Sequence, residues 1–183
     1  MDFDRYAPAM GELLWNMHAL ESCLRGYLHQ ANTIRYPSAS AGDIERLAVV
    51  KEGERVPEGF LNNHDSFWKL IDQYNGLVPP ALALDKTIAG LRDALFDGKF
   101  FSADSPASLR LIKFAAPSLR KDVEVRLAVD VTPAWLDEAN NRARAQLAKV
   151  REAAHLLREQ HQTDKSPKLD ASKVSEPALA AAA

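Results

Sequence analysis

Two long segments of helical periodicity constrain the fold of this chain more than any other feature. In the first, from about residue 9 to residue 32, apolar residues recur at alternating steps of four and three: Leu13, Met17, Leu20, Leu24, Tyr27 and Ala31. The second, from Pro133 to about residue 161, carries Leu136, Ala139, Ala143, Leu147, Val150, Ala154 and Leu157. Such spacing puts the apolar side chains on one face of an α-helix. We therefore expect two long helices that pack antiparallel to each other.

Two short helices are expected between the long ones. The first has apolar residues at helical spacing from Phe67 to Tyr74. The second begins after Asp85, whose carboxylate can cap its first turn, and ends at Gly98. Before them, prolines and glycines interrupt any periodicity over residues 36–60, so we expect mainly loop in that segment.

A β-hairpin is expected before the second long helix. Apolar and polar residues alternate strictly over residues 123–131, and residues 109–115 can pair with them across a polar loop at residues 117–122. We expect the preceding Phe100 and Phe101 to lie in the core. The fold class is therefore mainly α, a helical bundle of two long antiparallel helices and two short helices, with a β-hairpin at about residues 109–131.

The length and composition indicate one domain with a short appendage. The chain has 183 residues, 46% of them hydrophobic, which is enough for one core. We expect this domain to cover residues 1–162. Residues 163–183 combine Lys, Ser, Pro and Asp with a terminal Ala run and show no apolar period, so we expect a disordered tail.

Charge and cysteine content exclude several classes of protein. The formal net charge of −2 provides no global basic field, so nucleic acid would have to bind at a local patch. The single cysteine, Cys23, has no partner for a disulfide or a zinc site. No apolar run approaches the roughly 20 residues that span a bilayer. We expect a cytoplasmic protein with no membrane contact, no metal and no cofactor.

The most distinctive short motif lies at the end of the second short helix. Residues 91–98 read Leu-Arg-Asp-Ala-Leu-Phe-Asp-Gly. Arg92 lies at the edge of the apolar stripe, and Asp97 follows five residues later, facing the same region. A purely structural explanation is available, in which Arg92 and Asp97 form a local ion pair at the helix end and Gly98 is the C-cap.

These eight residues resemble the motif of the HEPN superfamily (higher eukaryotes and prokaryotes nucleotide-binding), in which four to six residues stand between an arginine and the histidine that follows it. The resemblance implies a helical homodimer of bacterial style whose paired motifs form a composite cleft, and in many members this cleft cuts RNA without metal. Arg92 would hold the phosphate, while Asp97 stands where the family has histidine.

The replacement of histidine bears on two functional hypotheses. A carboxylate is a poor proton donor at neutral pH and repels phosphate. We therefore expect a catalytically degenerate or weakened RNA-directed member of toxin–antitoxin or phage-defence type, which if active would be a metal-independent endoribonuclease. The alternative is a non-enzymatic helical dimerisation or binding module for a protein or a small molecule. Both hypotheses include a homodimer, although a monomeric antiparallel bundle would explain the same periodicity.

Other residues could contribute to binding. The candidate RNA-binding residues lie on and beside the hairpin: Lys99, Arg110, Lys113 and Arg126. His64 precedes the first short helix and could approach the helix that carries the motif, or could simply be a solvated residue. His18 and His29 lie three turns apart on the first long helix, and we expect both at the surface or in an interface.

Overall fold

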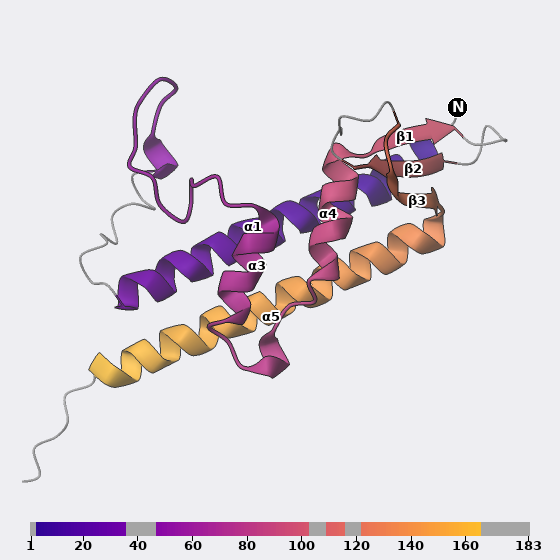
Figure 1. The fold of residues 1–183 in the computed structure, drawn as a ribbon. Coiled ribbons are helices and arrows are strands. Elements are labelled where there is room, and N and C mark those ends of the chain that lie inside the picture. Colours follow the sequence, from indigo (N-terminus) through magenta and orange to yellow (C-terminus); the bar gives the residue numbers. More distant parts are fainter. Residues whose placement is uncertain (1–2, 36–46, 103–108, 116–121, 166–183) are drawn as a thin grey trace, which may run out of the picture.

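The computed structural model describes residues 3–35, 47–102, 109–115 and 122–165. It is mainly helical with a small antiparallel sheet, which confirms the predicted fold class (Figure 1). The elements are η1 (Phe3–Arg5), α1 (Ala7–Arg35), α3 (Phe67–Asn75), η2 (Pro80–Leu82), α4 (Thr87–Asp97), β1 (Lys99–Ser102), β2 (Leu109–Phe114), β3 (Val125–Val131) and α5 (Pro133–Lys165). The last helix thus includes the first three residues of the predicted tail, and the rest of that tail lies outside the described residues.

The two long helices run side by side in the same direction, so the prediction of an antiparallel pair is wrong. Near the start of both helices, Nδ2 of Asn16 donates to Oδ1 of Asn140 at 2.9 Å. Further along both, Tyr27 and Leu157 line one surface pocket. The reason is the path between them: α3 and α4 carry the chain back to the end where α1 began, and α5 starts there (Figure 1).

The apolar stripes of α1 and α5 pack against each other within one chain. The core side chains that are no more than 1% exposed include residues of both long helices and of α3: Leu13, Met17, Leu20, Leu24, Leu70, Ile71, Tyr74, Leu136, Ala143 and Val150. A second copy of the chain is therefore not needed to bury these stripes. Among the described residues, no helix combines the length and the apolar composition that crossing a membrane requires.

The sheet contains the predicted hairpin of β2 and β3 and one strand that was not predicted. Strand β1 pairs with β2 at the edge of the sheet, in the order β1-β2-β3. Phe100 and Phe101 lie on β1 and are 38% and 45% exposed, so their expected place in the core is wrong. The reason is that α4 packs on only one face of the sheet, where Leu109 and Leu111 are buried.

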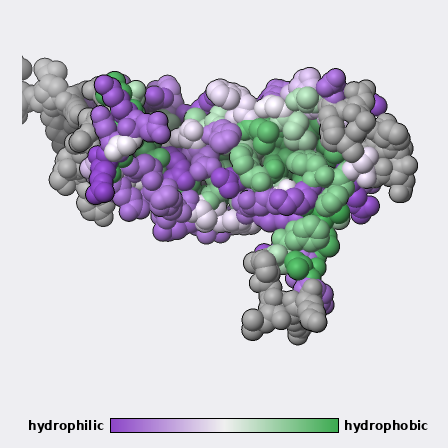
Figure 2. All heavy atoms as spheres, turned by 90° about the horizontal axis from the view of Figure 1, so that it is seen from above, coloured by the Kyte–Doolittle hydropathy of each residue, from purple (hydrophilic) through white to green (hydrophobic). Residues whose placement is uncertain are grey.

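The far end of the hairpin projects from the body. Phe114, Val123 and Val125 lie there and are between 42% and 50% exposed. Figure 2 shows this apolar arm, together with further hydrophobic side chains gathered over the same end of the molecule. Apolar and polar residues therefore alternate along the whole of β3, but the strand is buried only at its end near Val131, which is 1% exposed.

Gly98 joins α4 to β1 where the chain has no room for a side chain. A Cβ atom at this position would overlap the carbonyl oxygen of Ala94 and would lie 2.6 Å from Cδ1 of Leu111. The backbone itself is ordinary, with φ at −70°. Glycine is therefore required here by the close approach of α4 to β2, and not by an unusual backbone conformation.

We expect Gly98→Ala to lower the free energy of unfolding by about 1–3 kcal/mol, because the added methyl group meets backbone that cannot move freely. Urea denaturation measures this change. Gly76→Ala is the matched control at the end of α3, since its Cβ would lie at an ordinary 3.5 Å from the nearest atom. Equal stability of the two variants would contradict the packing argument.

Candidate functional site

Arg92 of α4 is engaged by its own chain. Its Nη2 atom donates to Oε2 of Glu21 on α1 at 3.1 Å, and its Nη1 atom lies 3.6 Å from Oδ1 of Asp93. Its Nε atom is buried and has no hydrogen-bond acceptor among the described residues. The guanidinium also lies 4.8 Å from the ring centroid of Phe96. Two carboxylates of its own chain therefore already lie beside the guanidinium of Arg92, and a phosphate would have to compete with them.

Asp97 does not pair with Arg92. Its carboxylate is 69% exposed and lies 3.9 Å from Nζ of Lys113 on β2. Five positions along an α-helix correspond to a rotation of about 140°, so the two side chains diverge. The two motif residues therefore do not face one region, and the predicted local ion pair between them is not formed.

Glu21 is the residue on which this region depends, and the sequence analysis missed it. Its Oε1 atom accepts from Nη2 of Arg25 at 2.8 Å, while its Oε2 atom holds Arg92. Arg25 in turn donates to the carbonyl oxygens of Phe60, Asn63 and Asp65, each at 3.2 Å. One carboxylate thus connects α1 to α4 and to the segment that leads into α3. The only sequence signal was a Glu-Arg pair four residues apart on one helix face.

The predicted basic patch is divided between the two faces of the sheet. Lys99 is directly opposite Ile112 in the register, and Arg110 lies two residues before Ile112, so these two basic residues share the outer face. Nε of Arg110 also lies 3.9 Å from the carboxylate of Asp130 on the neighbouring strand β3. Lys113 lies on the opposite face, between the carboxylates of α4. The four candidates therefore do not form one continuous surface.

Of the three histidines singled out from the sequence, His18 is the one whose ring contacts a residue of the motif. His64 is exposed, and it does not appear among the contacts of Arg92 in the described part of the chain. His18 is exposed, as expected, and its ring lies 5.2 Å from the ring of Phe96 in an edge-to-face arrangement. His29 is only 8% exposed because the 56–62 segment of its own chain covers it, so its predicted surface or interface position is wrong.

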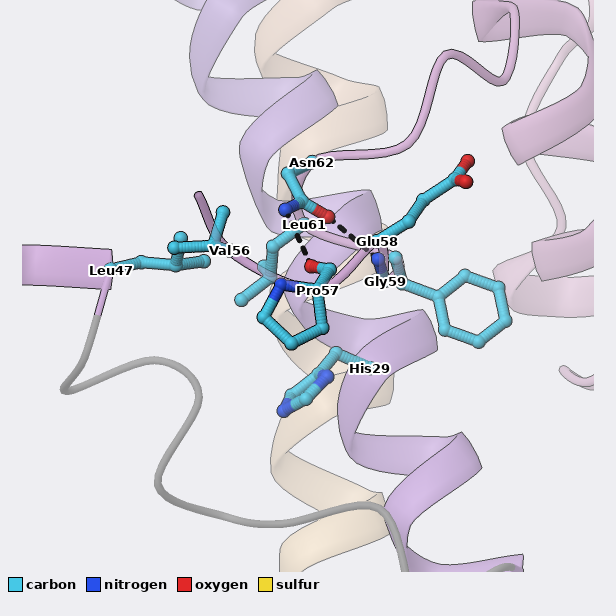
Figure 3. Close-up of a pocket in the computed structure, with 9 residues that line it drawn as sticks. His29, Leu47, Val56, Pro57, Glu58, Gly59, Leu61 and Asn62 are labelled. Atoms are coloured by element: carbon cyan, nitrogen blue, oxygen red, sulfur yellow. Dashed lines mark hydrogen bonds between the residues drawn. The ribbon is translucent and has the colours of Figure 1, made fainter. Parts of the chain in front are cut away.

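A small cavity adjoins His29. Figure 3 shows its walls, with the amide of Asn62 donating to the carbonyl oxygen of Pro57 and accepting from the N–H of Gly59. The cavity volume is about 30 Å³, enough for about one water molecule. It is therefore too small for an organic ligand. Within the described residues, no group of three or more His, Cys, Asp or Glu side chains could hold a metal ion.

A larger groove lies between α4, the sheet and the first turns of α5. Its volume is about 460 Å³, within the size range of small-molecule sites. The walls include two tryptophans, three cationic side chains and one carboxylate: Trp68, Trp135, Lys113, Arg126, Arg142 and Asp93. Of the predicted site residues, the structure brings Lys113 and Arg126 together here. The tryptophans come from distant parts of the sequence, and no local pattern indicated that they would meet.

Hydrogen bonds fix the position of several groove residues. Nε1 of Trp68 donates to Oδ2 of Asp93 at 3.2 Å. On the other side, Nη2 of Arg142 donates to Oγ1 of Thr87 at 2.7 Å. Thr87 is itself held by Asp85, whose carboxylate accepts from its N–H at 2.9 Å and from its hydroxyl at 2.6 Å. The carboxylate of Asp85 therefore binds the first N–H group of α4, although the residue at the N-cap position is Lys86. These bonds lower the pKa of the Asp85 carboxyl group, the side-chain bond contributing most.

We expect Glu21→Gln to lower the free energy of unfolding by about 1–2 kcal/mol, because two partly buried arginines lose their shared carboxylate. Urea denaturation measures the loss. Glu12→Gln on the same helix is the control, since Glu12 pairs with Arg144 at the exposed surface and we expect a change of no more than about 0.5 kcal/mol. A loss no greater than that of the control would show that Glu21 does not hold α4.

The lowered pKa of Asp85 predicts a pH dependence. In the folded protein this group binds protons less readily than in the unfolded chain, so its contribution is present above its ordinary pKa of 3.8 and is lost as the pH falls through the folded value. We expect the stability of Asp85→Asn to decline less than that of the wild type between pH 6 and pH 3. Urea denaturation at both pH values measures the difference, and identical declines would contradict this assignment.

Comparison with known proteins adds no assignment. No family model, no curated protein and no solved structure matches this chain significantly. The resemblance to the HEPN superfamily stays a prediction based on residues 91–98.

Proposed function

We propose that this chain is a non-enzymatic binding module that does not cleave RNA through its arginine motif. The observation that supports this proposal most is the engagement of Arg92. Nη2 is bonded to Glu21, Nη1 lies beside Asp93, and Nε is buried. An arginine that stabilises a phosphate in a transition state must direct free N–H groups at it.

The position of Asp97 also supports a non-catalytic function. General acid–base catalysis needs a proton-transferring group within hydrogen-bond reach of the reacting atoms. Asp97 diverges from Arg92 and lies instead beside Lys113. Among the described residues, the cation that pairs with Asp97 is therefore Lys113 and not the motif arginine.

The groove supports the positive part of the proposal. It is large enough for a small molecule and combines aromatic, apolar and cationic side chains. It shares Asp93 with the Arg92 network, because this carboxylate lies 3.6 Å from Arg92 and 3.5 Å from Lys113. The ion pairs around Arg92 thus hold one wall of a binding groove in place.

One observation favours an RNA-directed function as the second candidate. The ring of Phe96 contacts both His18, at 5.2 Å, and Arg92, at 4.8 Å. A histidine from α1 therefore lies in the neighbourhood of the motif arginine. In this second function His18 would replace the absent motif histidine.

Cleavage of RNA without metal separates the two functions. Purified wild type, Arg92→Ala, His18→Ala and Asp97→His are each incubated with total RNA in the presence of a chelator, beside a metal-independent ribonuclease as positive control. We expect no cleavage by any of the four proteins. Wild-type cleavage that disappears in both Arg92→Ala and His18→Ala would overturn the proposal and establish the nuclease, and cleavage by Asp97→His alone would show that Arg92 is still available to phosphate.

A further inference from the structure

We infer that the groove between α4, the sheet and α5 binds a small organic anion that carries a flat apolar ring. This inference rests on the proposed function, since it names the ligand of the binding module. Three features of the groove support it: the balance of its charges, the placement of its two indole rings, and its size.

The charges of the groove leave one cation for an anion. Lys113, Arg126 and Arg142 line it together with one carboxylate, Asp93. Lys113 is also paired with Asp97, and Arg142 with Asp85, at 3.9 and 3.7 Å. The carboxylate of Asp93 already accepts from Trp68 and lies near two cations, so it offers little attraction to a positively charged ligand. Among the described residues, no ion pair involves Arg126, which is exposed at the rim. Arg126 is therefore the cation most available to a bound acidic group.

The indole rings provide surfaces for a flat ring. Trp68 is 41% exposed, its Nε1 bond to Asp93 fixes its orientation, and it lies over Gly90, where a Cβ atom would be 3.9 Å from the ring. Trp135 lies in the first turn of α5, where its backbone N–H donates to Oγ1 of Thr132, and it is partly buried against the core. Aromatic surfaces that are held in place bind planar apolar groups with little loss of side-chain entropy.

The size of the groove favours a small molecule. Its volume of about 460 Å³ fits a ring system with one acidic substituent. The acidic group could be a carboxylate or a phosphate, because cationic side chains recognise both. The test therefore includes ligands of each kind.

The three tryptophans of the chain allow a direct test by NMR. Each indole N–H gives one signal in a spectrum of the ¹⁵N-labelled full chain, and single Trp→Phe variants assign the signals. Trp15 does not line the groove and is 72% exposed on α1, so it serves as an internal control. The anionic probes are 3-phenylpropanoate, phenyl phosphate and adenosine monophosphate. The matched controls are 3-phenylpropanol, which is neutral, and 3-phenylpropylamine, which is a cation.

We expect saturable shifts of the Trp68 and Trp135 signals with at least one anionic probe, and no comparable shift of Trp15. The neutral and cationic controls should bind at least about threefold more weakly than 3-phenylpropanoate if the carboxylate probe binds. A preference for phenyl phosphate and adenosine monophosphate over 3-phenylpropanoate would identify the acidic group as a phosphate. Equal responses to anion, neutral molecule and cation, or no saturable response to any anion, would overturn the inference.

Charge-removing variants locate the acidic group. We expect Arg126→Gln to weaken binding of the preferred anion about three- to tenfold. Arg110→Gln is the matched control, because Arg110 lies on the face of the sheet that is turned away from the groove and pairs with Asp130. We expect the Arg110→Gln variant to bind the anion with the affinity of the wild type. An equal loss in both variants would show a general effect of charge and no specific site.

The outcomes for this inference and for the proposed function are separate. RNA cleavage that depends on Arg92 would overturn the non-catalytic function even if the groove bound an anion. If no RNA is cleaved and the Trp68 and Trp135 signals do not shift with any anion, the non-catalytic function is still supported, but the small anion is excluded as its ligand.

Discussion

The mutual burial of two long apolar stripes is the constraint on which the rest of this structure depends. Helices α1 and α5 lie parallel, and each covers the apolar face of the other along most of its length. A parallel pair cannot be connected by a tight turn, because the chain must return over the length of α1, about 43 Å for 29 residues. The short helices make this return, and the sheet lies at the end where both long helices begin (Figure 1). The position of every candidate site residue follows from that path.

Glu21 shows how one polar side chain can organise the surface of such a core. One carboxylate oxygen of Glu21 accepts a hydrogen bond from Arg25, and the other accepts one from Arg92. Arg25 in turn donates to backbone carbonyl oxygens of the segment before α3. Removing one partner from an ion pair that is partly withdrawn from water leaves a charge without compensation, which costs more than the intact pair contributes. An arginine held in this way connects α4 to α1. A phosphate at Arg92 would have to compete with the carboxylate of Glu21.

The groove forms where α3, α4, α5 and the sheet meet. Trp68 comes from α3, Lys113 from β2 and Trp135 from α5, and the ion pairs of Asp93 connect its wall to the Arg92 network. The indole of Trp68 lies over Gly90 of α4. The sheet also separates the basic residues: Arg110 is on its outer face, while Lys113 faces the groove. The charges that remain near the groove are therefore those of a local site, in a chain whose net charge is −2.

The sequence by itself determined the local elements of this protein, because helices and strands are selected by the period of their apolar residues. The stripes through Leu20 and Ala143, the cap at Asp85 and the hairpin that ends at Val131 could all be predicted in this way. Only the tertiary structure decided the parallel direction of the long helices, the partner of Arg92 and the meeting of Trp68 with Trp135 in one groove. The period of a helix tells which face is buried, but not which distant segment covers it or in which direction that segment runs. Those choices depend on contacts between residues far apart in the chain, which no local pattern contains.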